Sequence, residues 1–361
     1  MHIPDGYLSP VACGAFYAVM LPLWYRATKR VKKIVKSQYV PLIAVGAAFS
    51  FLVMMFNIPV PDGTTAHAVG AVMIAIVLGP WAAVIAVSIA LGIKYLFFCD
   101  GGVLALGANS FNMAFVMPFV GFSVYRLLTR NMSLTSSARA VMAGVAGYVG
   151  IVAAALCAAI EFGLQPELFH TANGTPLYAP FHLSQTIPAM LLAHLTVAGV
   201  AEFICCFGVI TYLQRANVPI LRINHPDVPV TDEEMQRKKP LNWKHALLFF
   251  GVMVALTPIG LLAPGGAFGE DLPANLDLTK YHLSAAPEGL VRFSSFWSHA
   301  FLGGYGFGSG DHPVVGYLLS ALVGCALITL LLVGFVLVYR RFTTSREGSD
   351  GGSNDQERMA A

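Results

Sequence analysis

The sequence predicts an all-α protein that crosses a membrane several times, as a bundle of seven helices followed by a two-helix module. Its residues are 56% hydrophobic and 11% charged, and the mean hydropathy is +0.67, which soluble domains do not reach. Apolar runs of about 20 residues, the length that a helix needs to cross a bilayer, follow one another along the chain. Basic clusters alternate with these runs, as expected of cytoplasmic loops.

The first four apolar runs alternate between the two faces of the membrane. The first is followed by a basic cluster that indicates the cytoplasmic side, namely Arg26, Lys29, Arg30, Lys32, Lys33 and Lys36. The second returns the chain to an outer loop that ends at His67. A short helix is expected to start at His67 and to end at Gly79-Pro80, and the next helix leads outward to Asp100. The expected bounds are 8–25, 39–56, 67–78 and 81–98.

Three further runs complete the predicted bundle, and a polar linker follows it. These runs cover about 104–128, 140–162 and 185–213. The predicted domains are the bundle at 1–215, a cytoplasmic linker at 216–241, a two-helix module at 242–341 and a disordered cytoplasmic tail at 342–361. Within the module, spans at about 244–262 and 314–339 flank an outer loop at 264–313.

The distribution of charge predicts the orientation of the chain. Of the 22 Lys and Arg residues, only Lys94, Lys280 and Arg292 fall on the expected outer side. This asymmetry predicts that the N-terminus lies outside the cytoplasm and that the C-terminus lies inside it. Positive charge follows the first apolar run and does not precede it, so no cleavable signal peptide is expected.

Composition and motifs argue against several classes of function. The net charge of +3 gives no basic patch for nucleic acid. A phosphate-binding loop of the form G-x-x-x-x-G-K-[ST] and a zinc-protease motif H-E-x-x-H are both missing from the sequence, which favours a non-enzymatic role. The cysteines lie in apolar segments without C-x-x-C spacing and predict neither a zinc site nor a disulfide framework: Cys13, Cys99, Cys157, Cys205, Cys206 and Cys325.

The start of the chain carries the donors of a metal site. If Met1 is retained, as its bulky neighbour favours, its amine, the amide nitrogen of His2 and the imidazole of His2 form fused chelate rings around one ion. His67 is expected on the same face and supplies a fourth nitrogen. A deprotonated amide suits Ni(II) or Cu(II), with Co(II) also possible, better than Mg²⁺ or Zn²⁺. The alternatives are a frayed terminus and a histidine that is hydrogen-bonded at a helix start.

Polar residues near this set are candidates to orient the ligands, because a metal-bound histidine usually has its second ring nitrogen held by a neighbour. These candidates are Asp5, Thr64, Thr65, Asp100, Asn109, Ser110 and Asn112. Ionisable residues within or at the edges of the spans are functional candidates too, with interhelical hydrogen bonding as the alternative: Lys94, Glu161, His194 and Glu202. Histidines of the outer loops carry less weight, because surface histidines are common: His170, His182, His282, His299 and His312.

Four segments resemble the substrate-binding M component of nickel/cobalt energy-coupling-factor transporters, the CbiM/NikM family. They are Met1-His2-Ile3-Pro4-Asp5-Gly6-Tyr7-Leu8, Gly63-Thr64-Thr65-Ala66-His67, Leu78-Gly79-Pro80-Trp81-Ala82, and Asp100-Gly101-Gly102 with Leu106-Gly107-Ala108-Asn109-Ser110-Phe111-Asn112-Met113-Ala114. The likeness covers about the first 215 residues. From Leu241 the chain is similar to the N component, CbiN/NikN. The outer-loop segments that resemble it are Phe296-Trp297-Ser298-His299-Ala300 and Tyr305-Gly306-Phe307. A third segment matches only loosely, at Pro287-Glu288-Gly289-Leu290-Val291.

The resemblance implies a specific function. It implies a bundle of the S-component type in the plasma membrane of a bacterium or archaeon, with Met1, His2 and His67 holding the transported ion and no separate cofactor. It also implies a transmembrane coupling subunit and cytoplasmic ATPases as partners. The leading hypothesis is therefore a substrate-capture subunit for Ni(II) or Co(II), with a slight preference for nickel. The alternative is a stand-alone metal carrier or channel that works without ATPases.

Overall fold

The computed structural model describes residues 1–34, 40–60, 64–237, 243–263, 266–307 and 311–334. Helices dominate this part of the chain, and its strands form a single antiparallel pair, β1 (Ile58–Pro59) with β2 (Thr65–Ala66). The predicted all-α class is therefore confirmed. The predicted tail, 342–361, lies entirely outside the described residues.

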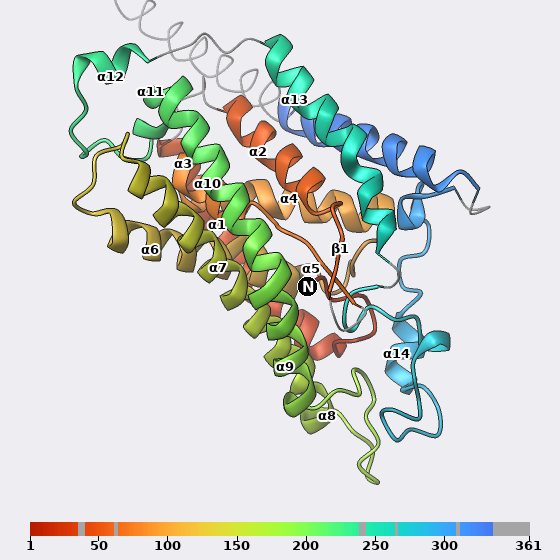
Figure 1. Ribbon diagram of the computed structural model, residues 1–361. Helices are drawn as coiled ribbons and strands as arrows, with labels where there is room; N and C mark the ends of the chain where they lie inside the picture. The colour runs from red at the N-terminus through yellow and green to blue at the C-terminus, as the bar shows by residue number, and fades with distance from the viewer. Residues whose placement is uncertain (35–39, 61–63, 238–242, 264–265, 308–310, 335–361) are drawn as a thin grey trace, which may run out of the picture.

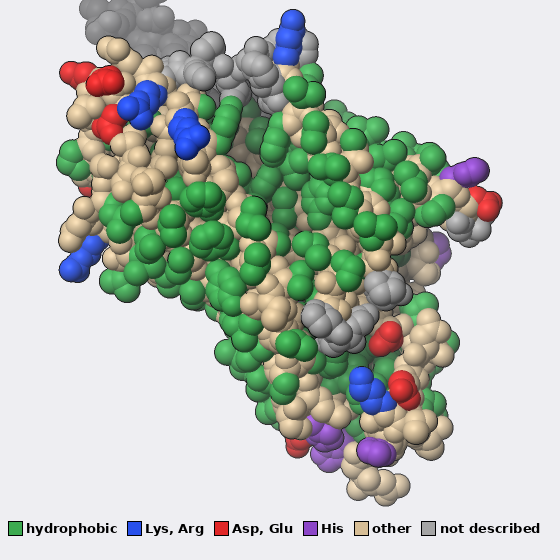
Figure 2. Space-filling view, in the orientation of Figure 1, with side chains coloured by type: hydrophobic (Ala, Val, Ile, Leu, Met, Phe, Trp, Pro, Cys, Tyr) green, Lys and Arg blue, Asp and Glu red, His purple; other side chains and the backbone are tan. Residues whose placement is uncertain are grey.

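Five helical stretches in the described part of the chain are long and apolar enough to cross a membrane. They are Pro80–Phe98, Leu106–Thr129, Ser137–Leu168, Leu183–Ala216 and Pro313–Gly334, and shorter apolar helices cover Pro41–Val53 and Leu247–Leu262. The protein is thus a multi-pass membrane protein. Hydrophobic side chains cover the middle of the face shown in Figure 2, whereas charged and histidine side chains gather at its ends.

The bundle is built from long helices, two of which contain a π-helical stretch that widens the turn. Its elements are α1 (Pro10–Ile34), α2 (Val40–Val53), α3 (Ala71–Leu78), α4 (Pro80–Phe98), α5 (Leu106–Asn109), η2 (Ser110–Val116), α6 (Met117–Thr129), α7 (Ser137–Gly163), α8 (Gln165–Leu168), α9 (Leu183–Ala193), η3 (His194–Ala198) and α10 (Gly199–Ala216). Helices α6, α9 and α10 pack along α7 (Figure 1). Helix α3 is buried along its whole length and contacts α4, α6 and α7.

Helix α3 begins later than the sequence predicts. The expectation was a start at His67, but the helix starts at Ala71, and the residue before it, Gly70, has a φ of +74°. A left-handed residue cannot continue an α-helix. His67 therefore lies in an irregular segment between β2 and α3, and the backbone of this segment is free to bond with other elements.

The C-terminal part of the chain folds back onto the bundle. Its elements are α11 (Val218–Arg222), α12 (Asp232–Gln236), α13 (Trp243–Leu256), η4 (Thr257–Leu262), η5 (Pro273–Asn275), α14 (Glu288–Phe293), η6 (Gly303–Tyr305) and the helix Pro313–Gly334. The amide of Gly289 donates to Leu177 O at 2.8 Å, and the Tyr7 hydroxyl donates to Asp271 O at 2.7 Å. The loop between the last two apolar helices thus covers the start of the chain.

Candidate metal site

The first residues of the chain are buried in the bundle. Met1, His2 and Ile3 have exposed fractions of 3%, 2% and 0%. Asn109, at the end of α5, forms two hydrogen bonds with this segment. The Ile3 amide donates to Asn109 Oδ1 at 2.8 Å, and Asn109 Nδ2 donates to Ile3 O at 3.0 Å. In Figure 1 the N mark accordingly lies in the middle of the molecule, next to α5. The terminus is thus held in a fixed position and does not fray.

Asp5 anchors the same segment to the turn after α4. Its carboxylate accepts hydrogen bonds from the amides of Val103, Leu104 and Ala105, at 3.1, 2.8 and 3.3 Å. Burial raises the pKa of Asp5, and these three amides oppose the shift. A Cβ added to Gly102 would lie 2.3 Å from Asp5 Oδ1, so only glycine allows this close approach.

The structure brings His2 and His67 together. Their ring centroids lie 4.9 Å apart, with 26° between the planes. His67 Nδ1 lies 3.0 Å from Ala68 O, which fixes Nδ1–H as the donor, whereas His67 Nε2 is buried without a hydrogen-bond partner. A buried ring nitrogen that carries a free lone pair is costly unless it has a ligand to bind. This arrangement suits a metal bond at Nε2.

Glu202 of α10 positions the segment that carries His67. Its carboxylate accepts from the amide of Val69 at 2.8 Å and from the amide of Gly70 at 2.9 and 3.1 Å. Ser50 Oγ of α2 donates to Val69 O at 2.7 Å. Glu202 therefore bonds to the non-helical segment before α3 and not to a second helix, and these bonds fix the backbone only two residues from a candidate ligand.

Lys94 of α4 contacts the other candidate ligand. Its Nζ lies 3.2 Å from His2 Nε2 and 2.7 Å from Asp100 Oδ2, and Tyr95 Oη lies 2.9 Å from His2 Nδ1. Tyr305, from the C-terminal part of the chain, also donates to Asp100. Burial would raise the pKa of Asp100, but Lys94 and Tyr305 hold it below its ordinary value.

The N-terminal amine lies near an acidic side chain of the C-terminal loop. Met1 N lies 3.8 Å from Glu270 Oε1. Burial lowers the pKa of the amine, and Glu270 opposes the shift. Burial also lowers the pKa of His2 and of His67 well below the ordinary value, and Lys94 adds to both shifts. Neutral imidazoles and a readily deprotonated amine are the forms in which these groups bind metals.

Main-chain nitrogens are needed to complete a metal site here. Among the residues that the structure describes, no group of three or more His, Cys, Asp and Glu side chains is placed to hold a metal ion. The two histidines become a set of four nitrogen donors only when the Met1 amine and the His2 amide take part. Such a set favours a metal that accepts planar nitrogen coordination.

The other polar candidates named from the sequence make the following contacts. The Thr64 carbonyl accepts from Val60 N, and Thr65 pairs with Pro59 across the small sheet. Asn112 Nδ2 donates to Glu161 Oε2 at 2.9 Å, Ser110 Oγ is buried without a hydrogen-bond partner, and His194 Nδ1 lies 2.7 Å from Met190 O.

Three residues near the site were not predicted from the sequence, namely Tyr95, Glu270 and Tyr305. Tyr95 lies beside Lys94, which the sequence did single out as a membrane-edge charge. Glu270 and Tyr305 follow the bundle by more than 50 residues, and no spacing rule connects them to the N-terminus.

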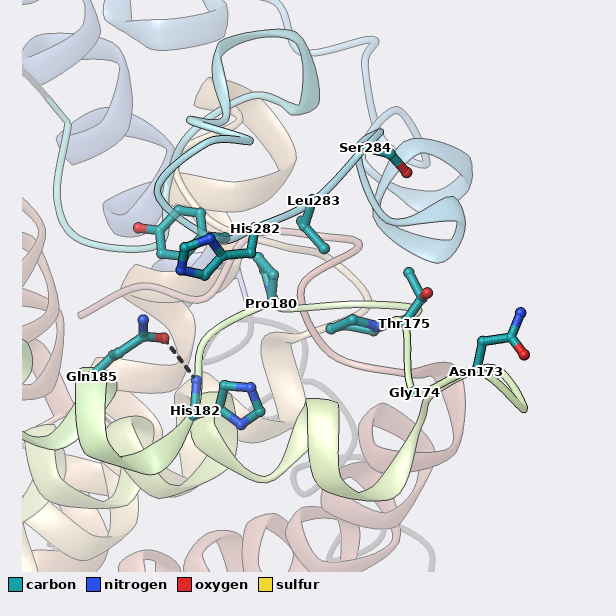
Figure 3. Close-up of a pocket in the computed structure, with 11 residues that line it drawn as sticks. Asn173, Gly174, Thr175, Pro180, His182, Gln185, His282, Leu283 and Ser284 are labelled. Atoms are coloured by element: carbon teal, nitrogen blue, oxygen red, sulfur yellow. Dashed lines mark hydrogen bonds between the residues drawn. The ribbon is translucent and has the colours of Figure 1, made fainter.

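A surface cavity lies apart from these residues. It has a volume of about 370 Å³ and lies between the loop after α8 and the loop before α14, with His182 and His282 on opposite sides (Figure 3). His182 Nδ1 lies 2.9 Å from Glu167 Oε1, and both side chains are 57% exposed. Met1, His2 and His67 do not line this cavity.

Comparisons with known proteins agree on one family. The family model described as "CbiM: Cobalt uptake substrate-specific transmembrane region" matches residues 2–220. The fused nickel transport protein NikMN of Rhodobacter capsulatus is 45% identical over 342 residues, which cover 91% of this chain and 95% of that protein. The probable fused nickel transport protein LarMN of Lactiplantibacillus plantarum is 42% identical and covers 92% of this chain and 97% of its own length.

A solved structure is similar to part of this chain. The crystal structure of a truncated transition metal transporter is 55% identical, with a TM-score of 0.56, and covers 59% of this chain and 98% of its own. The two fused relatives thus align over nearly the whole sequence. The solved structure aligns over a little more than half of it.

Proposed function

Because the chain belongs to the CbiM family of cobalt uptake substrate-specific transmembrane regions, we propose that it is the substrate-capture subunit of an ATP-driven importer for nickel or cobalt. The protein is a fused member of this nickel/cobalt transport family, since relatives named as fused nickel transport proteins match it over more than nine tenths of its length. The proposal goes further in three respects: the metal site, the partners and the orientation.

The proposed site uses the Met1 amine, the His2 amide, the His2 imidazole and His67 Nε2. One observation carries it: the chain's first two residues are buried against His67, whose Nε2 has no hydrogen-bond partner. Three donors from adjacent residues form fused chelate rings, and His67 is the fourth. Low-spin Ni(II) gains most from such a planar field, so nickel is the favoured substrate.

The proposed partners supply the energy for transport. The sequence lacks a phosphate-binding loop for ATP, so hydrolysis is assigned to cytoplasmic ATPases that act through a transmembrane coupling subunit. The distribution of Lys and Arg supports an N-terminus, and hence a metal site, on the outer face, with the C-terminus in the cytoplasm.

Metal titration tests the site. The purified full chain, its native N-terminus verified by mass spectrometry, is stripped of metal and titrated with Ni(II) and Co(II), while calorimetry and visible absorption are recorded. A matched chain carries one extra residue before Met1. We expect the native chain to bind one equivalent with the yellow colour of planar nickel, and the extended chain to lose this binding. Equal binding by both chains would rule out the site.

Uptake in cells tests the partners. The chain is expressed with and without the coupling subunit and the ATPases in a host that lacks its own nickel importers. Uptake that requires the partners and stops when the ATPase is inactivated supports the proposal. Full uptake by the chain alone would instead favour a stand-alone carrier or channel.

A further inference from the structure

Lys94 is a buried cation in direct contact with a proposed metal ligand. Its side chain is 0% exposed. Its Nζ lies 3.2 Å from His2 Nε2, 2.7 Å from Asp100 Oδ2 and 3.3 Å from Met54 O. A buried ammonium is costly unless each hydrogen finds an acceptor, and these three contacts supply the acceptors. The contact with His2 is therefore part of what stabilises Lys94 in this position.

This contact is incompatible with the proposed metal bond to His2. An ammonium can only donate, so His2 Nε2 accepts and Nδ1 carries the ring hydrogen toward Tyr95 Oη, 2.9 Å away. A metal bond at Nδ1 would leave the hydrogen of the neutral ring on Nε2, where Lys94 cannot accept it. The proposed fused chelate uses Nδ1, because Nε2 cannot close a ring with the amide nitrogen of the same residue.

This inference rests on the proposed function. We infer that Lys94 competes with the metal for His2. It holds His2 in the metal-free protein and leaves His2, while keeping Asp100, when the metal binds. This role fits a subunit that must release what it captures. After release, the buried His2 nitrogen would otherwise lack a partner, and Lys94 supplies one. Lys94 thereby lowers the affinity for the metal and speeds its dissociation.

The charges around Lys94 predict opposite changes in metal affinity for two substitutions. The ammonium repels a divalent cation, and the Asp100 carboxylate offsets that repulsion. Removal of the Lys94 charge should therefore tighten metal binding, whereas removal of the Asp100 charge should weaken it. If the pair had only a structural role, loss of either partner would disturb the site and weaken binding in both cases.

The experiment measures Ni(II) affinity and the rate of Ni(II) loss to an excess of chelator, in the full-length protein. Lys94→Met keeps the length of the side chain without its charge, Lys94→Arg keeps the charge, and Asp100→Asn removes the partner's charge. We expect Lys94→Met to bind about tenfold or more tightly and to release nickel more slowly. Lys94→Arg should show no gain in affinity, and Asp100→Asn should bind more weakly. Weaker binding by Lys94→Met would overturn the inference.

Two further measurements separate the possible failures. The native and N-terminally extended chains are titrated in parallel: if they bind nickel alike, the proposed function fails, and if only the native chain binds but Lys94→Met shows no gain, the inference alone fails. Should Lys94→Met not fold, a structure of the nickel-loaded native chain decides. Lys94 Nζ displaced from His2 supports the inference, and Lys94 Nζ still within hydrogen-bond distance of Nε2 overturns it.

Discussion

The imidazole rings of His2 and His67 stack with their centroids 4.9 Å apart, although 65 positions separate them in the sequence. The stacking depends on two anchors: Asn109 fixes the backbone of Ile3, and Glu202 fixes the amides of Val69 and Gly70. Each candidate ligand is thus held by a residue from a different helix. The site consequently exists only when the bundle is folded.

Substitution of His67 by Ala should abolish tight nickel binding. The change removes the buried Nε2 and leaves only the three donors of the N-terminus, so we expect the affinity measured by calorimetry to fall by about a hundredfold or more. His182→Ala is the matched control, because His182 lies at the outer cavity and not at the site. Equal losses in the two variants would contradict the assignment of His67.

Asn109→Ala should weaken nickel binding without removing a ligand. It deletes both hydrogen bonds to Ile3, so the N-terminal segment loses its fixed position, and we expect the affinity to drop by about tenfold to a hundredfold. Asn173→Ala, on an exposed loop, is the control. The account would be wrong if Asn109→Ala bound nickel as the native chain does.

Gly102→Ala should disturb the N-terminal segment by steric overlap. The added methyl group would meet Asp5 Oδ1 at 2.3 Å and the Asp5 amide nitrogen at 2.6 Å, so the segment must shift. Overpacking of this kind costs roughly 1–3 kcal/mol of folding free energy. Thermal unfolding and nickel titration should both show the loss. Gly303→Ala, whose methyl group meets no atom within 4 Å, should change neither.

Nickel affinity should rise with pH, because metal binding displaces protons. Burial lowers the pKa of the Met1 amine below its ordinary value of 8.0. Below that lowered pKa the metal displaces two protons, from the amine and the His2 amide, and the affinity should rise about a hundredfold per pH unit. Above it only the amide proton is released, and the rise should fall to about tenfold. The two histidines add nothing near neutral pH, because their pKa values lie well below 6.5.

Calorimetry in buffers of different ionisation enthalpy counts these protons directly. A count that falls from two to one across the amine pKa is the expected result. An affinity that does not change with pH would mean that no amide is deprotonated, and the planar nitrogen set would have to be abandoned.

Sequence reasoning predicted the fold class, because apolar composition determines it, and it placed His2 and His67 on the same face, where the structure brings their rings together. Apolar runs and basic clusters predict spans, and a Met-His start predicts a chelate. The start of α3 was predicted four residues too early, since the conformation of Gly70 depends on the amide bonds to Glu202 in another helix. Spacing likewise could not show that Asp100 pairs with Lys94, or that Glu270 reaches Met1, because both contacts arise only from tertiary packing.

Anomalous diffraction at the nickel absorption edge, from crystals of the nickel-loaded full chain, tests the central claim most directly. The account predicts one strong peak within bonding distance of the Met1 amine nitrogen, the His2 amide nitrogen, a ring nitrogen of His2 and His67 Nε2, in one plane. A peak elsewhere, for example at His182 and His282 in the outer cavity, with none at the N-terminus, would contradict it.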